Sequence, residues 1–162
     1  MNQTTPKMVL IIRHGEKPAD KSDPNLSAAG RLRAQMLAQR LPALYAISAL
    51  FAAAQSKGSN RPNETIQPLS EAIHVPIDDS FAVDQHEALA EQILHDSPGL
   101  TDKIVLICWH HEEIPALAGD LDATPVPPSW PGDDFDSIWQ LHYSASGLAT
   151  LTVSKEPPVA PT

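Results

Sequence analysis

The chain has 162 residues, a net charge of −9, a single cysteine, and no run of about 18 apolar residues that would span a membrane. These features favour one domain and exclude an intramolecular disulfide. They also argue against nucleic acid and membranes as partners, because phosphate backbones repel an acidic chain. Residues 1–7 are polar and lack the apolar region of a signal peptide, so we expect a cytoplasmic protein.

The charge is distributed unevenly along the chain. Residues 1–61 contain nine Lys or Arg and three Asp or Glu, whereas residues 62–162 contain two and 17. The basic residues Arg13, Lys17 and Arg61 are expected to attract an anionic substrate. Three further arginines are interpreted as the solvated face of a helix: Arg31, Arg33 and Arg40.

The first predicted element is a strand over 8–12, where a run of apolar and β-branched residues offers no polar face to water. Ser27 is the predicted N-cap of a helix that continues to about residue 41, with apolar residues repeating along one face. A second apolar run predicts a strand over 46–53, and a polar loop over 55–60 follows it.

The remaining elements continue this alternation. Pro62 suits the first turn of a helix. Further elements are expected as helices over 85–96 and 113–119, a strand over 104–109 that buries Cys108, and edge strands over 137–143 and 148–153. The alternation predicts an α/β fold, a three-layer α/β/α sandwich with a mostly parallel central sheet. We expect the domain to span 1–155 and residues 156–162 to form a flexible C-terminal tail.

Charged or titratable side chains follow the predicted strands and open a predicted helix. Arg13, His14 and Gly15 follow the first strand, Arg61 stands at the entry to a helix, and His110 follows the 104–109 strand. In a parallel sheet these positions share the carboxyl edge, where ligands bind. A neutral imidazole is a nucleophile, and guanidinium groups bind anionic oxygens, so the combination suits attack on a phosphoryl group.

The ordered motifs resemble those of the histidine phosphatase superfamily, also called phosphoglycerate mutase-like. Four segments carry the resemblance: Arg13-His-Gly-Glu16, Leu26-Ser-Ala-Ala-Gly-Arg31, Arg61-Pro-Asn-Glu-Thr65 and Ile107-Cys-Trp-His110. Together they span roughly residues 8–119. The short length makes the chain similar to the small phosphohistidine phosphatases of that superfamily.

The resemblance implies a role for each matching residue. His14 would be the nucleophile that becomes phosphorylated, and Arg13, Arg61 and His110 would hold the phosphoryl oxygens. Gly15 would let the turn after the strand pack closely beside the substrate. Lys17 stands where many members have Thr or Ser, and adds a cation for phosphate. Members of the superfamily need no metal and no organic cofactor.

The chain departs from the superfamily after the second His. A small residue is usual there, whereas this chain continues His110-His111-Glu112-Glu113. The carboxylates either donate a proton to the leaving group or weaken phosphate binding by repulsion, and both interpretations are open. Glu112 and Asp84 are the leading candidates for the leaving-group acid, ahead of Asp78, Asp79 and Glu87.

Two other patterns have simpler explanations. Residues 110–113 look like a metal cluster, but adjacent residues leaving a strand point to opposite faces, so we expect no metal site. Residues 120–124 mimic the aspartate motif of haloacid dehalogenase-like phosphatases, but they follow a helical segment and are interpreted as an acidic turn. Trp130 and Trp139 are expected to anchor the core or a loop.

Chain length narrows the substrate class. Only 48 residues separate Arg61 from His110, too few for a large substrate-covering insertion. An open site suits a phosphorylated small molecule or a phosphohistidine protein as partner, and disfavours a mutase, which must enclose its substrate. The sequence therefore predicts a phosphatase that acts through a phosphohistidine on His14. The alternative is a catalytically weak module of the same fold that only binds phosphorylated ligands.

Overall fold

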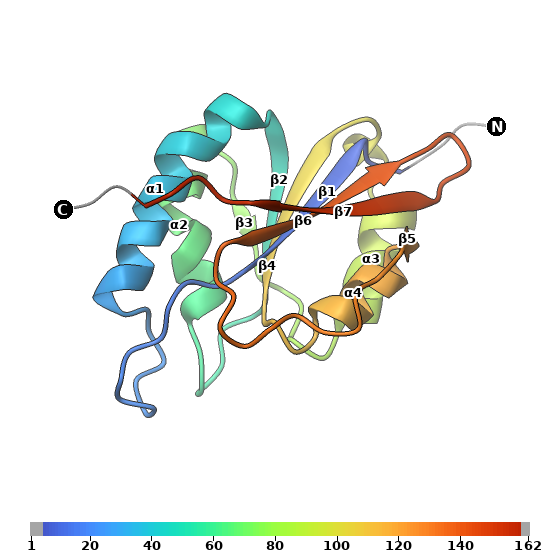
Figure 1. Cartoon of the computed structure of the whole chain (residues 1–162). Helices are drawn as coiled ribbons and strands as arrows, with labels where there is room; N and C mark the ends of the chain where they lie inside the picture. The colour runs from blue at the N-terminus through green and yellow to red at the C-terminus, as the bar shows by residue number, and fades with distance from the viewer. Residues whose placement is uncertain (1–4, 160–162) are drawn as a thin grey trace.

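The computed structural model describes residues 5–159. It contains a seven-stranded sheet with helices on both sides (Figure 1). In chain order the elements are β1 (Met8–Arg13), α1 (Ala28–Leu44), β2 (Ile47–Ala52), α2 (Arg61–Ile73), β3 (Ile77–Asp78), α3 (His86–His95), a 3₁₀ turn (Pro98–Leu100), β4 (Ile104–Trp109), α4 (Ile114–Asp120), β5 (Ala123–Thr124), β6 (Ser137–Tyr143) and β7 (Ala149–Lys155).

The strands lie in the order β3-β2-β4-β1-β6-β7-β5. The pairs β1–β4, β2–β4, β2–β3 and β5–β7 are parallel, whereas β6 runs antiparallel to both of its neighbours. The predicted three-layer α/β fold with a mostly parallel sheet is confirmed. Because β1 and β4 are adjacent and in register, with Arg13 opposite Trp109, the residues that follow the two strands emerge at the same edge.

The sheet separates two hydrophobic cores, and β1 shows why its sequence has no polar face. Val9 and Ile11 pack in the core that includes α3 and α4, whereas Leu10 and Ile12 pack in the core that includes α1 and α2. Successive side chains of a strand point to opposite faces, so a strand covered on both sides is apolar at every position. Figure 1 shows α1 and α2 on one side of the sheet and α3 and α4 on the other.

The predicted helix starts agree well with the structure. Ser27 is the N-cap of α1, where its hydroxyl accepts a hydrogen bond from the Gly30 N–H at 3.1 Å. Pro62 lies in the first turn of α2, where a missing N–H costs nothing. The strands β3 and β5 were not predicted, because two residues are too few to show a periodic pattern. Within residues 5–159, no helix combines the length and the hydropathy that a bilayer crossing requires.

The expected boundary between domain and tail is wrong, because the chain stays packed beyond residue 155. Glu156 is only 5% exposed and forms an ion pair with Arg33 of α1. Val159 packs against the core next to α1 and α2. The sequence did not predict this packing, because a single Glu followed by Pro157 is typical of a solvent-exposed C-terminal segment. Residues 160–162 of the expected tail lie outside the described residues.

Candidate active site

The residues that follow β1 and β4 meet directly. The backbone N–H of His14 donates to the carbonyl of Trp109, the last residue of β4, at 3.3 Å. The rings of His14 and His110 are in edge-to-face contact, with centroids 5.1 Å apart. The parallel register of the two strands therefore brings together two imidazoles that are 96 positions apart in the sequence.

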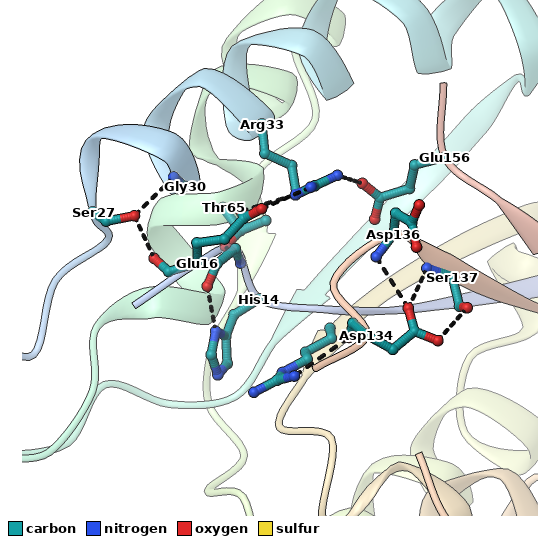
Figure 2. Close-up of polar contacts among 12 residues, drawn as sticks. His14, Glu16, Ser27, Gly30, Arg33, Thr65, Asp134, Asp136, Ser137 and Glu156 are labelled. Carbon is teal, nitrogen blue, oxygen red and sulfur yellow. Dashed lines mark hydrogen bonds and ion pairs between the residues drawn. The ribbon is translucent and has the colours of Figure 1, made fainter. Parts of the chain in front are cut away.

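His14 is held in the state that a nucleophile needs. Its Nδ1 lies 2.7 Å from the carbonyl oxygen of Gly15 (Figure 2). A carbonyl can only accept a hydrogen bond, so Nδ1 carries the proton and Nε2 of the neutral ring keeps its lone pair. Burial, together with the nearby charges of Arg13 and Lys17, lowers the pKa of His14 to about 3. The imidazole is therefore neutral near pH 7.

A buried hydrogen-bond chain connects the loop after β1 to the start of α2. The N–H of Gly15 donates to Oγ1 of Thr65 at 2.8 Å, and that hydroxyl donates to the carbonyl of Arg61 at 2.7 Å. A Cβ on Gly15 would lie 3.1 Å from backbone atoms of Gly30, so the close approach of this loop to α1 favours glycine. Gly15 therefore acts by packing, and its N–H is occupied by Thr65.

Arg61 is positioned by backbone carbonyls. Its Nε donates to the carbonyl of Asn25 at 3.1 Å and its Nη2 to that of Asp23 at 2.6 Å, and the residue is only 6% exposed. Nη1 has no partner within residues 5–159. The loop before α1 thus holds the guanidinium in one orientation and leaves its charge without a carboxylate partner.

Arg13 is held in a similar way by the loop before β6. Its Nη1 donates to the carbonyls of Gly132 at 2.7 Å and Asp134 at 3.3 Å, and Phe135 covers the guanidinium at 3.8 Å. The carboxylate of Asp134 accepts instead from Asp136 and Ser137 (Figure 2). Burial lowers the pKa of Arg13, although an arginine still stays protonated at neutral pH.

Glu16 of the Arg-His-Gly-Glu motif belongs to a separate cluster. Figure 2 shows Arg33 reaching from α1 between Glu16 and Glu156. Its Nη2 lies 2.7 Å from Oε2 of Glu16, and its Nη1 lies 3.0 Å from Oε1 of Glu156. The interpretation of Arg33 as a solvated residue is wrong, because its side chain is 12% exposed. Burial raises the pKa of Glu156 to about 8, because its effect exceeds the opposing effect of Arg33. No sequence signal linked Glu16 to Glu156, which are 140 positions apart.

A cavity of about 320 Å³ opens beside Arg61 and His110. Its lining is formed by Ser56, Gly58, Ser59, Arg61, Val83, His110, Glu112 and Glu113. Burial lowers the pKa of His110 to about 4, so this imidazole is also neutral. The side chain of Glu112 is 74% exposed at the rim of the cavity, whereas Asp84 is exposed and lies next to the lining residue Val83.

Lys17 is exposed near the same residues. Burial and repulsion from Arg13 and Arg61 lower its pKa, which places the three cations in one region. The structure therefore gathers all the predicted site residues around the ends of β1 and β4, with Gly15 serving the packing of the loop. Within residues 5–159, no group of three or more His, Cys, Asp or Glu is arranged to hold a metal ion.

The structure adds one aromatic residue that the sequence did not single out, Phe135. Its ring lies over Arg13 and 6.4 Å from the His14 ring. The sequence signal that could have identified Phe135 is an aromatic residue between aspartates in a polar loop. Trp130 and Trp139 anchor this loop to the core as expected, with ring centroids 5.1 Å apart. Cys108 is fully buried, also as expected.

Comparison with known proteins identifies the fold. No family model matches the sequence, and no curated protein matches it. The structure is similar to that of the protein histidine phosphatase SixA complexed with tungstate, with a TM-score of 0.65, 16% identity, and coverage of 91% of this chain and 96% of the other. It is also similar to mycobacterial glucosyl-3-phosphoglycerate phosphatase in complex with inorganic phosphate, with a TM-score of 0.64, 15% identity, and coverage of 94% and 97%. The chain has the histidine phosphatase fold.

Proposed function

We propose that this protein is a metal-independent histidine phosphatase that hydrolyses phosphomonoesters or protein phosphohistidine through a phosphohistidine on His14. The observation that carries the proposal is the neutral His14 imidazole, fixed through Nδ1 to the Gly15 carbonyl. Arg13 and Arg61 are buried, and neither has a carboxylate within ion-pair distance among residues 5–159. Structural similarity to one protein complexed with tungstate and to another in complex with inorganic phosphate supports an oxyanion site.

The first chemical step transfers the phosphoryl group to His14. Nε2 attacks phosphorus, and the bond breaks to the leaving oxygen of a phosphomonoester or to the leaving imidazole nitrogen of a phosphohistidine. That leaving atom takes the electron pair and a proton. The ring becomes positively charged, and its Nδ1–H donates more strongly to the Gly15 carbonyl. Arg13, Arg61, Lys17 and the neutral His110 donate to the phosphoryl oxygens, where charge is greatest in the transition state.

The second step returns His14 to its starting state. Water attacks the phosphohistidine, the P–N bond breaks, and inorganic phosphate leaves, while the electron pair returns to Nε2. We assign Glu112 as the acid that protonates the leaving group and the base that activates this water, because it borders the cavity beside His110. Asp84 is placed second because it lies next to a lining residue rather than in the lining.

The site also supports the proposed range of substrates. The cavity is at the small end of the size range of ligand pockets and opens to solvent, so it suits a small phosphorylated molecule or a phosphorylated side chain at a protein surface. The charge supplied by Arg13, Arg61 and Lys17 takes the role that a metal has in other phosphatases, so activity is expected to survive chelation by EDTA. We further propose that the protein acts in the cytoplasm.

The test is trapping of the phosphoenzyme. Acid quenching of the wild type with a ³²P-labelled aryl phosphate should give a stoichiometric, base-stable and acid-labile adduct. His14→Asn should remove the adduct and lower kcat by a factor on the order of 10⁴. His95→Asn, at a site where the side chain is 59% exposed, is the matched control and should behave as the wild type. Tight phosphate binding without any adduct or turnover would favour the alternative, a module that only binds phosphorylated ligands.

A further inference from the structure

We propose that the cavity beside the nucleophile selects substrates whose leaving group carries a positive charge, such as an ammonium or guanidinium group. The inference rests on the proposed phosphatase function and deepens it by naming the substrate class. Its basis is the presence of both signs of charge in one cavity, whose lining contains Arg61 and His110 together with Glu112 and Glu113.

The phosphate-binding part of the cavity lining is a built site. Arg61 is 6% exposed, is held through Nε and Nη2, and has Nη1 without a partner within residues 5–159. Burial lowers the pKa of His110, and among the nearby charges Glu112 raises that pKa whereas Lys17 and Arg61 lower it. A phosphoryl group bound here has its charge matched by arginine and lysine, so it does not need a cation elsewhere on the substrate.

The carboxylates in the same lining serve the rest of the substrate. Glu112 is 74% exposed, and its nearest ionic partner is His111 at 4.0 Å, too far for a hydrogen bond. Glu113 is 39% exposed and has His86 at 3.4 Å, which Asp120 also contacts. The other lining side chains near them are hydroxyls and Val83, with no lysine among them.

This arrangement distinguishes leaving groups by charge. An anionic leaving group would place its charge against Glu113 and against Glu112 as it gives up its proton, whereas a cationic one would be attracted by both. Exposed ion pairs contribute modestly, and each corresponds to a factor of about 1.4 to 5 in binding. Two carboxylates therefore predict a preference on the order of 10-fold for a cationic over a neutral leaving group.

The experiment uses three aryl phosphates that differ mainly in charge: 4-(aminomethyl)phenyl, 4-(hydroxymethyl)phenyl and 4-(carboxymethyl)phenyl phosphate. The methylene group insulates the phenol, so the leaving groups have similar acidity. Values of kcat/KM at low ionic strength should fall from the cationic to the neutral to the anionic substrate. Equal values, or the reverse order, would overturn the inference.

Variants identify the source of the preference. Glu112→Gln and Glu113→Gln should each reduce the ratio of cationic to neutral kcat/KM, and the double variant should remove the preference. Glu71→Gln on an exposed part of α2 is the matched control and should keep the wild-type ratio. Loss of a general acid slows all three substrates together, so the ratio separates selection by charge from proton donation. A ratio unchanged in the double variant would refute the assignment.

Two further measurements keep the proposal testable if a variant does not fold. Raising the salt concentration from 0.05 to 0.5 M should reduce the wild-type preference, since the carboxylates are exposed to solvent.

The positive charge on the substrate can belong to a small aminoalkyl phosphate or to a lysine beside phosphohistidine in a protein. Phosphoethanolamine and phosphohistidine peptides flanked by Lys or Glu distinguish these sources. Turnover without any charge preference refutes only this inference, whereas absence of turnover on every substrate refutes the phosphatase function as well.

Discussion

Two pairs of carboxylates lie near the ends of β1 and β4, and their surroundings give them different uses. Glu16 and Glu156 share Arg33, and the Glu156 side chain has no exposed surface. Glu112 and Glu113 border the cavity, and Glu112 is mostly exposed. A carboxylate that is buried beside a cation braces the fold, whereas an exposed carboxylate near a phosphate site is available to a substrate.

The largest expected difference between the two pairs is in stability. Arg33→Met keeps much of the side-chain volume but leaves the carboxylate of Glu16 without its cation and buried Glu156 without its hydrogen-bond donor, so the free energy of unfolding should fall by about 3 kcal/mol. Urea unfolding measures this change. Arg40→Met, at an exposed site on the same helix, should change it by less than about 0.5 kcal/mol. Equal effects of the two substitutions would show that the buried cluster does not brace the fold.

A pH series sharpens the comparison through Glu156. Burial raises its pKa to about 8, so the folded state binds a proton that the unfolded state loses near the ordinary Glu value of 4.5. The contribution of Glu156 to stability is therefore greatest below that value, falls as pH rises between the two, and is constant above about 8. The slope is at most about 1.4 kcal/mol per pH unit.

Glu156→Gln removes the titration while keeping an oxygen that accepts from Arg33. The wild type minus variant difference in unfolding free energy, measured in urea from pH 5 to 9, should decline with pH and then level off. Glu71→Gln is the exposed control. A difference that does not vary with pH would mean that Glu156 is ionised in the folded protein throughout this range.

The smallest effect on stability is expected at Glu112, where the consequence is instead catalytic. Glu112→Gln should change the unfolding free energy by less than about 0.5 kcal/mol, since the side chain is exposed. If Glu112 is the leaving-group acid, the variant should slow the hydrolysis of alkyl phosphates much more than that of activated aryl phosphates, which leave without a proton. Steady-state kinetics on both classes tests this. Equal slowing of both would transfer the role to Asp84.

Local patterns predicted most of the fold. The apolar runs of β1 and β4 identified buried strands, because a strand covered on both faces must be apolar throughout. Ser27 and Pro62 marked helix starts, because capping and the missing proline N–H are local effects. The same approach missed β3 and β5, which form through pairing with β2 and β7 rather than through any preference of two residues.

The sequence likewise predicted only part of the candidate site. The sequence identified Arg13, His14, Arg61 and His110, because they stand at the ends of predictable elements. It did not identify Phe135 over Arg13, or the carbonyls of Asp23 and Asn25 that orient Arg61. These contacts come from irregular loops, whose backbone path no periodicity encodes.

The sequence by itself predicted the proposed phosphoryl-transfer chemistry, because that prediction depends only on the identity and order of the Arg and His residues. Only the tertiary structure decided which charged groups lose their water. Arg33 and Glu156 look like surface residues in the sequence, yet the fold buries both, whereas Glu112, in an equally polar segment, stays exposed. Desolvation depends on contacts between segments more than 100 positions apart, and it gives identical carboxylates opposite roles.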